Sequence, residues 1–71
     1  PPDIFERIRV AKEHVSMLVS EKGEKVGICE ARKHVSWYIK GIPLAAIARR
    51  SVNYTTTLDE MFDILDTLLD N

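Results

Sequence analysis

The chain has 71 residues, enough for one small domain with a correspondingly small hydrophobic core. Its single cysteine, Cys29, excludes an internal disulfide and gives no Cys/His spacing for zinc, so the sequence predicts a reducing, cytoplasmic setting. No apolar run approaches the roughly 20 residues that span a bilayer, and no signal peptide is recognisable, so no membrane partner is expected.

The formal net charge of -1 conceals an uneven distribution. Residues 1–50 hold all 10 Lys and Arg residues together with six acidic residues, whereas residues 51–71 hold five acidic residues and no Lys or Arg. Only the first part of the chain therefore has the charge to attract a polyanion.

The chain begins without an initiator methionine, and Pro1-Pro2-Asp3 has the character of a linker that enters a helix. A chain this short buries a small fraction of its surface, so its stability should be marginal unless a larger partner covers one side. We therefore expect a fragment of a larger protein.

A first helix is predicted from about Ile4 to Glu21, with Asp3 as its N-cap and Gly23 just past its end. Its inward stripe has the spacing of a helix bundle and consists of Ile4, Ile8, Ala11, Val15 and Leu18. Val10 and Met17 form a small second apolar stripe on the opposite face. This stripe is either a contact with an absent partner or ordinary exposed apolar surface.

A second helix is predicted from about Glu24 to Lys40. Gly27, near its start, either permits a close helix crossing or marks where the helix begins. The inward stripe consists of Ile28, Ala31, Val35, Tyr38 and Ile39. Cys29 lies beside the outward face, and no neighbouring residue pattern activates it, so we interpret it as an inert small residue.

The outward face of this second helix carries Lys33, Trp37 and Lys40, with Arg32 and His34 on its flanks. An aromatic ring between two cations suits a phosphate backbone with exposed bases or sugars. Alternatively, Trp37 packs under a neighbouring helix and the lysines are ordinary solvated charges whose stems cover it.

A short third helix is predicted from Pro43 to about Arg50, after a stop at Gly41. Leu44, Ile47 and Ala48 are expected to face inward. Arg49 and Arg50 fall at its C-terminal end, where they either complement the helix dipole or contact phosphate.

The fourth helix is predicted to open with a capping box, Thr57 to Glu60. Its inward stripe consists of Leu58, Met61, Phe62, Leu65, Leu68 and Leu69. Its outer face is an acidic stripe of Asp59, Asp63, Asp66 and Asp70, which would repel nucleic acid. The sequence therefore predicts an all-α fold, a compact antiparallel four-helix bundle whose third helix is short.

No catalytic constellation is visible in the sequence. There is no Gly-rich phosphate loop and no zinc spacing, and His14 and His34 are expected to be surface or boundary residues on different helices. We predict no catalytic, metal or cofactor residue in this chain.

The segment Ala-Arg-Lys-His-Val-Ser-Trp-Tyr-Ile-Lys-Gly-Ile-Pro, residues 31–43, closely resembles the Arg-Lys-His-x-x-Trp-Tyr-x-Lys-Gly-x-Pro motif of bacterial tRNA-dihydrouridine synthases. That motif belongs to the C-terminal helical domain of the family. The resemblance extends over the chain, from Glu13-His14 through the Ala-rich helix ending in Arg49-Arg50 to the Thr-capped last helix.

The resemblance implies a two-domain flavoenzyme. An N-terminal (β/α)8 barrel would bind FMN and reduce a tRNA uridine with hydride from NAD(P)H, and the helical domain would contact the barrel and help to bind tRNA. The family's flavin site and catalytic cysteine belong to the barrel, which lies outside these 71 residues. The family motif falls on Arg32, Lys33, His34, Trp37, Tyr38, Lys40, Gly41 and Pro43, followed by Arg49 and Arg50.

We therefore expect residues 1–71 to form one helical RNA-binding domain, with Arg32, Lys33, His34, Trp37, Lys40, Arg49 and Arg50 as its RNA-binding residues. The main alternative is a protein-interaction or scaffolding domain that uses Trp37, Val10 and Met17 as apolar contacts. DNA binding is not expected, because the aliphatic run from Leu44 to Ala48 lacks the base-reading side chains of a recognition helix.

Overall fold

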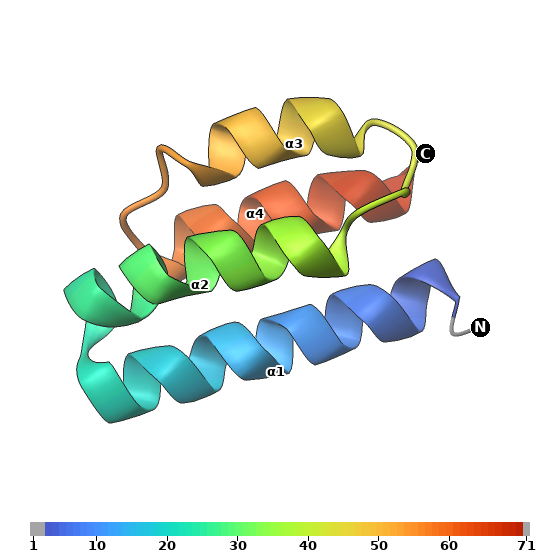
Figure 1. Ribbon diagram of the computed structural model, residues 1–71. Helices are drawn as coiled ribbons and strands as arrows, with labels where there is room; N and C mark the ends of the chain where they lie inside the picture. The colour runs from blue at the N-terminus through green and yellow to red at the C-terminus, as the bar shows by residue number, and fades with distance from the viewer. Residues whose placement is uncertain (1–2, 71) are drawn as a thin grey trace.

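The computed structural model describes residues 3–70, and within them the chain forms four α-helices with no strand. These are α1 (Ile4–Lys22), α2 (Glu24–Tyr38), α3 (Ala45–Val52) and α4 (Leu58–Thr67), and a short 3-10 turn, η1 (Leu68–Asp70), follows α4. Consecutive helices run in opposite directions, and α1 and α3 each lie beside both α2 and α4 (Figure 1). The predicted all-α antiparallel bundle with a short third helix is confirmed.

The core is built from the inward stripes of all four helices. The most deeply buried large side chains are Ile8, Val15, Ile28, Val35, Ile39, Val52, Met61, Leu65 and Leu68. Small residues fill the gaps between them, because Ala11, Ala31, Ala45 and Ala48 are also buried. The periodicity of α1, α2 and α4 therefore predicted their inward faces correctly. Among residues 3–70, no helix combines the length and the apolar character needed to cross a bilayer.

The capping groups predicted for α1 and α4 are present. The Asp3 carboxylate accepts a hydrogen bond of 2.8 Å from the backbone N–H of Glu6. At α4, Thr57 accepts from the N–H of Glu60, and the Glu60 carboxylate accepts from the N–H of Thr57 in return. The backbone N–H of Thr56 also donates to this carboxylate and holds the pKa of Glu60 below its ordinary value.

Gly27 lies where α2 crosses α1 closely. A Cβ placed on Gly27 would approach the Val19 Cα to 2.7 Å and the Leu18 carbonyl oxygen to 2.8 Å. Both atoms belong to the backbone of α1. A backbone atom cannot rotate away from the added methyl group as the end of a side chain can. Of the two interpretations of Gly27, the close helix crossing is therefore the correct one.

The predicted bounds of helices two and three need correction. Helix two ends at Tyr38 rather than Lys40, and α3 begins at Ala45 rather than Pro43 and extends to Val52. The N–H of Ala45 donates to the carbonyl of Ile42 at 3.0 Å across a turn in which Leu44 has a positive φ of 69°. Pro43 therefore belongs to that turn, and α3 starts two residues later than the proline signal suggested.

This shift also changes which face of α3 is buried. Ala45, Ala48 and Val52 face the core, whereas Leu44 is 53% exposed and Ile47 is 56% exposed. The prediction that Ala48 faces inward is confirmed, and the same prediction for Leu44 and Ile47 is wrong. A helix of eight residues offers only two turns of pattern, and a run of four aliphatic residues, 45–48, fits more than one rotation about its axis.

We expect Gly27→Ala to destabilise the protein, although alanine is the better helix former by up to about 1 kcal/mol. The added methyl group must push α1 and α2 apart, and overpacking of this kind costs about 1–3 kcal/mol. Thermal unfolding followed by circular dichroism should show a net fall in Tm of several degrees. Cys29→Ala, at an exposed position of the same helix, is the control and should leave Tm nearly unchanged. An equal or higher Tm for Gly27→Ala would show that the crossing can relax freely.

Candidate nucleic-acid interface

The outer face of α2 presents an aromatic ring between two cations. Trp37 is 73% exposed, and Lys33 and Lys40 are also exposed. Lys33 lies one helical turn before Trp37, and Lys40 lies in the turn that follows the helix. The prediction that Trp37 points away from the core is confirmed. We call Lys33, Trp37 and Lys40 the indole face.

Two contacts hold the end of α2 that carries the indole face. The Arg7 guanidinium, on α1, donates to the carbonyl of Tyr38 at 2.8 Å and to the carbonyl of Lys40 at 2.6 Å. These carbonyls lie at the C-terminal end of a helix, where no intrahelical N–H remains to bond them. The Tyr38 ring meets the Trp37 ring edge-on, with centroids 6.2 Å apart and planes at 80°. Arg7 therefore fixes the chain on both sides of Ile39 while the indole stays open.

Arg32 has a structural contact that the sequence did not reveal. Its guanidinium donates two hydrogen bonds, of 3.2 and 2.6 Å, to the carbonyl oxygen of Thr55. Thr55 lies between α3 and α4, so Arg32 ties α2 to that connection. The structure therefore places Arg32 on the side of α2 that faces the other helices, apart from the indole face.

His34 lies on the other flank of the indole face and meets His14 of α1. The two imidazole rings have centroids 4.6 Å apart, and Nδ1 of His14 lies 3.2 Å from the Tyr38 hydroxyl. Trp37, Tyr38, His14 and His34 thus form a continuous row of rings across α1 and α2. Sequence reasoning placed the histidines on separate helices and missed this row. The missing information was the relative rotation of the two helices.

The remaining predicted basic residues lie on α3. Arg49 is partly buried and Arg50 is exposed, in the turn before the helix ends at Val52. Because α3 packs beside α2, the arginine pair lies on the helix next to the one that carries Lys33 and Trp37. The predicted basic residues are therefore divided between α2, the turn that follows it, and α3.

One carboxylate lies near the indole face, and its charge is compensated. Glu30 precedes Lys33 and His34 on α2 and accepts two hydrogen bonds, of 2.9 and 2.8 Å, from the Lys22 ammonium. The Lys22 hydrogen bond lowers the pKa of Glu30, so the carboxylate stays ionised and paired. It therefore adds little net negative charge beside the lysines.

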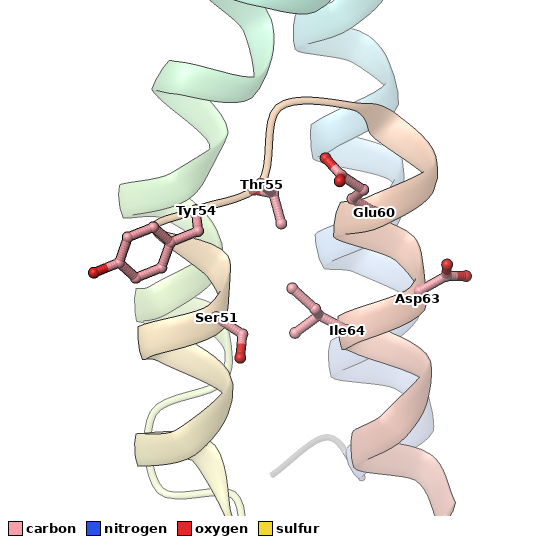
Figure 2. A pocket seen from close by; sticks show the side chains of 6 residues that line it. All are labelled: Ser51, Tyr54, Thr55, Glu60, Asp63 and Ile64. Atoms are coloured by element: carbon pink, nitrogen blue, oxygen red, sulfur yellow. The ribbon is translucent and has the colours of Figure 1, made fainter.

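The opposite side of the bundle is acidic. A surface pocket of about 410 Å³ between α3 and α4 has Glu60 and Asp63 on its α4 side, with Ser51, Tyr54, Thr55 and Ile64 as its other lining residues (Figure 2). Nearby, Asp66 pairs with Lys12 of α1, whose ammonium also lies 5.2 Å from the Phe62 ring centroid. Asp66 lies near the C-terminal end of α4, where the helix dipole disfavours a negative charge, and the Lys12 ammonium offsets this. A polyanion has no electrostatic reason to bind this side.

Within residues 3–70, no group of three or more His, Cys, Asp or Glu side chains could hold a metal ion, and Cys29 is exposed. The model of the dihydrouridine synthase (Dus) family matches residues 1–71, the whole chain. The chain belongs to the dihydrouridine synthase family.

Relatives with curated descriptions agree with this assignment to the dihydrouridine synthases. The chain is 34% identical over 68 residues to a probable tRNA-dihydrouridine synthase of Mycobacterium tuberculosis (strain ATCC 25618 / H37Rv), a match that covers 96% of this chain and 18% of the relative. It is 38% identical over 65 residues to probable tRNA-dihydrouridine synthase 1 of Synechocystis sp., covering 92% of this chain and 18% of the relative. It is 41% identical over 58 residues to tRNA-dihydrouridine synthase B of Vibrio cholerae, a match that covers 82% of this chain and 18% of the relative.

The chain thus spans less than a fifth of the length of these dihydrouridine synthases. No solved structure matches it. The resemblance drawn from residues 31–43 is confirmed at the level of the family.

Neighbouring basic residues of this dihydrouridine synthase domain should differ in their effect on stability. We expect Arg32→Gln to lower the free energy of unfolding by about 1–2 kcal/mol, because both hydrogen bonds to Thr55 are lost. Lys33→Gln, at the next position, should change it by less than about 0.5 kcal/mol, since Lys33 is exposed. Urea unfolding of both variants makes the comparison. Equal effects would contradict the structural role of Arg32.

Proposed function

We propose that residues 1–71 are the tRNA-binding helical domain of a cytoplasmic tRNA-dihydrouridine synthase. Reduction of uridine would take place in a separate N-terminal (β/α)8 barrel domain that binds FMN and uses NAD(P)H. Family membership and the length of the relatives support this division. The family resemblance implies that the flavin binds in the barrel. In this chain, the pocket between α3 and α4 carries the carboxylates of Glu60 and Asp63, which do not suit a cofactor phosphate.

The indole face is the observation that carries the proposal. Lys33 and Lys40 would contact phosphates, and Trp37 would stack on a base or pack against a ribose. Arg49 and Arg50 on α3 would extend the phosphate contacts, and His34 would lie at the edge of the bound RNA. Arg32 would help indirectly, by holding the α3–α4 connection. The acidic side of α4 would orient the domain, because it repels the same polyanion.

A protein-interaction domain is the alternative, and Val10 and Met17 favour it specifically. Val10 is partly exposed and Met17 is 49% exposed, but both line a shallow pocket with Tyr38 of α2, so this apolar stripe borders α2 and does not lie opposite the core as predicted. An electrostatic RNA contact weakens steeply with added salt, whereas an apolar protein contact does not.

Charge reversal on the indole face of the full-length enzyme should weaken tRNA binding. We expect Lys33→Glu and Lys40→Glu each to lower the affinity several-fold, and the double variant to flatten the salt dependence by about two phosphate contacts. Filter binding at several salt concentrations measures both quantities. Lys25→Glu changes the charge equally at another exposed position of α2 and is the matched control. Flavin content should stay normal in all variants, and unchanged tRNA affinity in the double variant would reject the assignment.

We expect Trp37→Ala to weaken tRNA binding while leaving the stability of the domain nearly unchanged. We expect tRNA affinity to fall by about tenfold, because stacking on one aromatic ring contributes about 1–3 kcal/mol per base. The Tm should change little, since the indole is mostly exposed and its edge-on contact with Tyr38 is its one described ring contact. Tight binding by the variant at unchanged Tm would show that the open indole does not meet RNA.

A further inference from the structure

A shallow pocket of about 340 Å³ lies beside the indole face, in the groove between α1 and α2. It is lined by Val10, Glu13, His14, Met17 and Tyr38. Its volume falls in the range of small-molecule sites, roughly 300–1,000 Å³. The Tyr38 ring belongs to the pocket wall and also meets the Trp37 ring, so the pocket adjoins the open indole directly.

The chemistry changes in a definite order across this surface. Around the axis of α2, Lys33 lies on one side of Trp37, and His34 and Tyr38 lie on the other, while Lys40 lies in the turn that follows the helix. Beyond Tyr38 the surface continues into the apolar side chains of the pocket. From Lys33 toward the pocket, the surface therefore presents a cation, then the indole ring of Trp37, then the polar ring of Tyr38, and then apolar side chains. A nucleotide that lies across it would place its phosphate, sugar and base in the same order.

We propose that this pocket receives one unpaired nucleobase of an RNA whose backbone lies on the indole face. The proposal rests on the function proposed above and deepens it. Val10 and Met17 would contact the face of the base, because both are apolar and exposed enough to be reached. The pocket is thus a site for base recognition, distinct from the lysines that contact phosphates.

The polar groups of the pocket suit the edge of a base. Nδ1 of His14 and the Tyr38 hydroxyl lie 3.2 Å apart, within hydrogen-bond distance, and the imidazole and the hydroxyl can each donate or accept, so the pair can offer both functions to a ligand. The His34 ring lies against the His14 ring at a tilt of 40° and so limits the movement of that imidazole. The carboxylate of Glu13 is an acceptor at the rim, and it shares the guanidinium of Arg9 with Glu6.

A nucleic acid fits this surface better than an apolar protein segment. An apolar segment over Val10 and Met17 would have to cover the polar atoms of Glu13, His14 and Tyr38 as well. It would also leave the two lysines beside Trp37 without a counter-charge. A nucleotide supplies a partner to every one of these groups.

The single tryptophan of the chain makes the test direct, because Trp37 is its only indole fluorophore. The 71-residue chain is titrated at low ionic strength with pentauridylate and with an abasic ribose-phosphate pentamer of equal charge. We expect pentauridylate to quench Trp37 emission and to bind about tenfold more tightly than the abasic pentamer. The abasic pentamer should bind through its phosphates alone, with little quenching.

Variants then assign the base-dependent part of the affinity to the pocket. His14→Ala and Met17→Ala should reduce the tenfold preference to less than threefold, while binding of the abasic pentamer stays within twofold of wild type. Lys33→Glu should weaken both oligomers together. Phe5→Ala truncates an exposed apolar residue on the far side of α1 and should change neither. Circular dichroism checks that each variant is folded. If His14→Ala unfolds, Met17→Ala alone tests the base pocket, because Met17 is half exposed and its truncation should not unfold the domain.

The outcomes separate this inference from the proposed function. Equal affinity for the two pentamers, with both weakened by Lys33→Glu, would overturn the base pocket and keep the phosphate-binding face. Binding of neither pentamer, with unchanged tRNA affinity in the full-length lysine variants, would overturn both. A preference for pentauridylate that survives both pocket variants would place the base elsewhere and also overturn the inference.

Discussion

The close packing of α1 against α2 determines where every side chain of the indole face lies. At one end, Gly27 lets the backbones approach so closely that a Cβ would lie 2.7 Å from the Val19 Cα. At the other end, Arg7 bonds the carbonyls of Tyr38 and Lys40 and so fixes the point where α2 stops. Between these two contacts α2 cannot rotate without burying the indole of Trp37 or exposing Val35. The exposed tryptophan is therefore a consequence of backbone contacts on the opposite face of the same helix.

The distribution of charge follows from the same arrangement. The other acidic residues of α4 lie on the far side of the bundle from the indole face, whereas Asp66 of α4 pairs with Lys12 of α1, and Glu30 of α2 pairs with Lys22. A net charge of -1 therefore coexists with a locally positive surface. For a polyanion the orientation of this domain matters more than its total charge, because the electrostatic field of each face decays over about 8 Å in physiological salt.

Sequence periodicity predicted much of this, and its failures have a physical cause. Stripes at i, i+3 and i+4 identify the inward face of a long helix, so the cores of α1, α2 and α4 and the outward position of Trp37 were predictable. The same stripes do not fix how two helices are rotated against each other, so the contact of His14 with His34 and that of Arg32 with Thr55 were not. In α3 the left-handed Leu44 moved the start of the helix, and no local signal marks a leucine for that conformation. The roles of the basic residues in RNA binding stay predictions.

The proposed RNA contact on the indole face consists of only two exposed lysines and one indole. This small number of groups limits the RNA affinity that the domain can provide alone. Each phosphate contact on single-stranded RNA contributes a salt-dependence slope of about 0.7, so two lysines and a nearby arginine pair yield a modest and salt-sensitive affinity. Phosphate contacts also position a nucleic acid without reading its sequence, whereas contacts to base edges specify it. A domain of this kind therefore acts best by orienting tRNA toward a separate catalytic domain, where further contacts add to the affinity. Under that division, the ring row of Trp37, Tyr38, His14 and His34 is the part of the surface with the chemistry to distinguish one RNA segment from another.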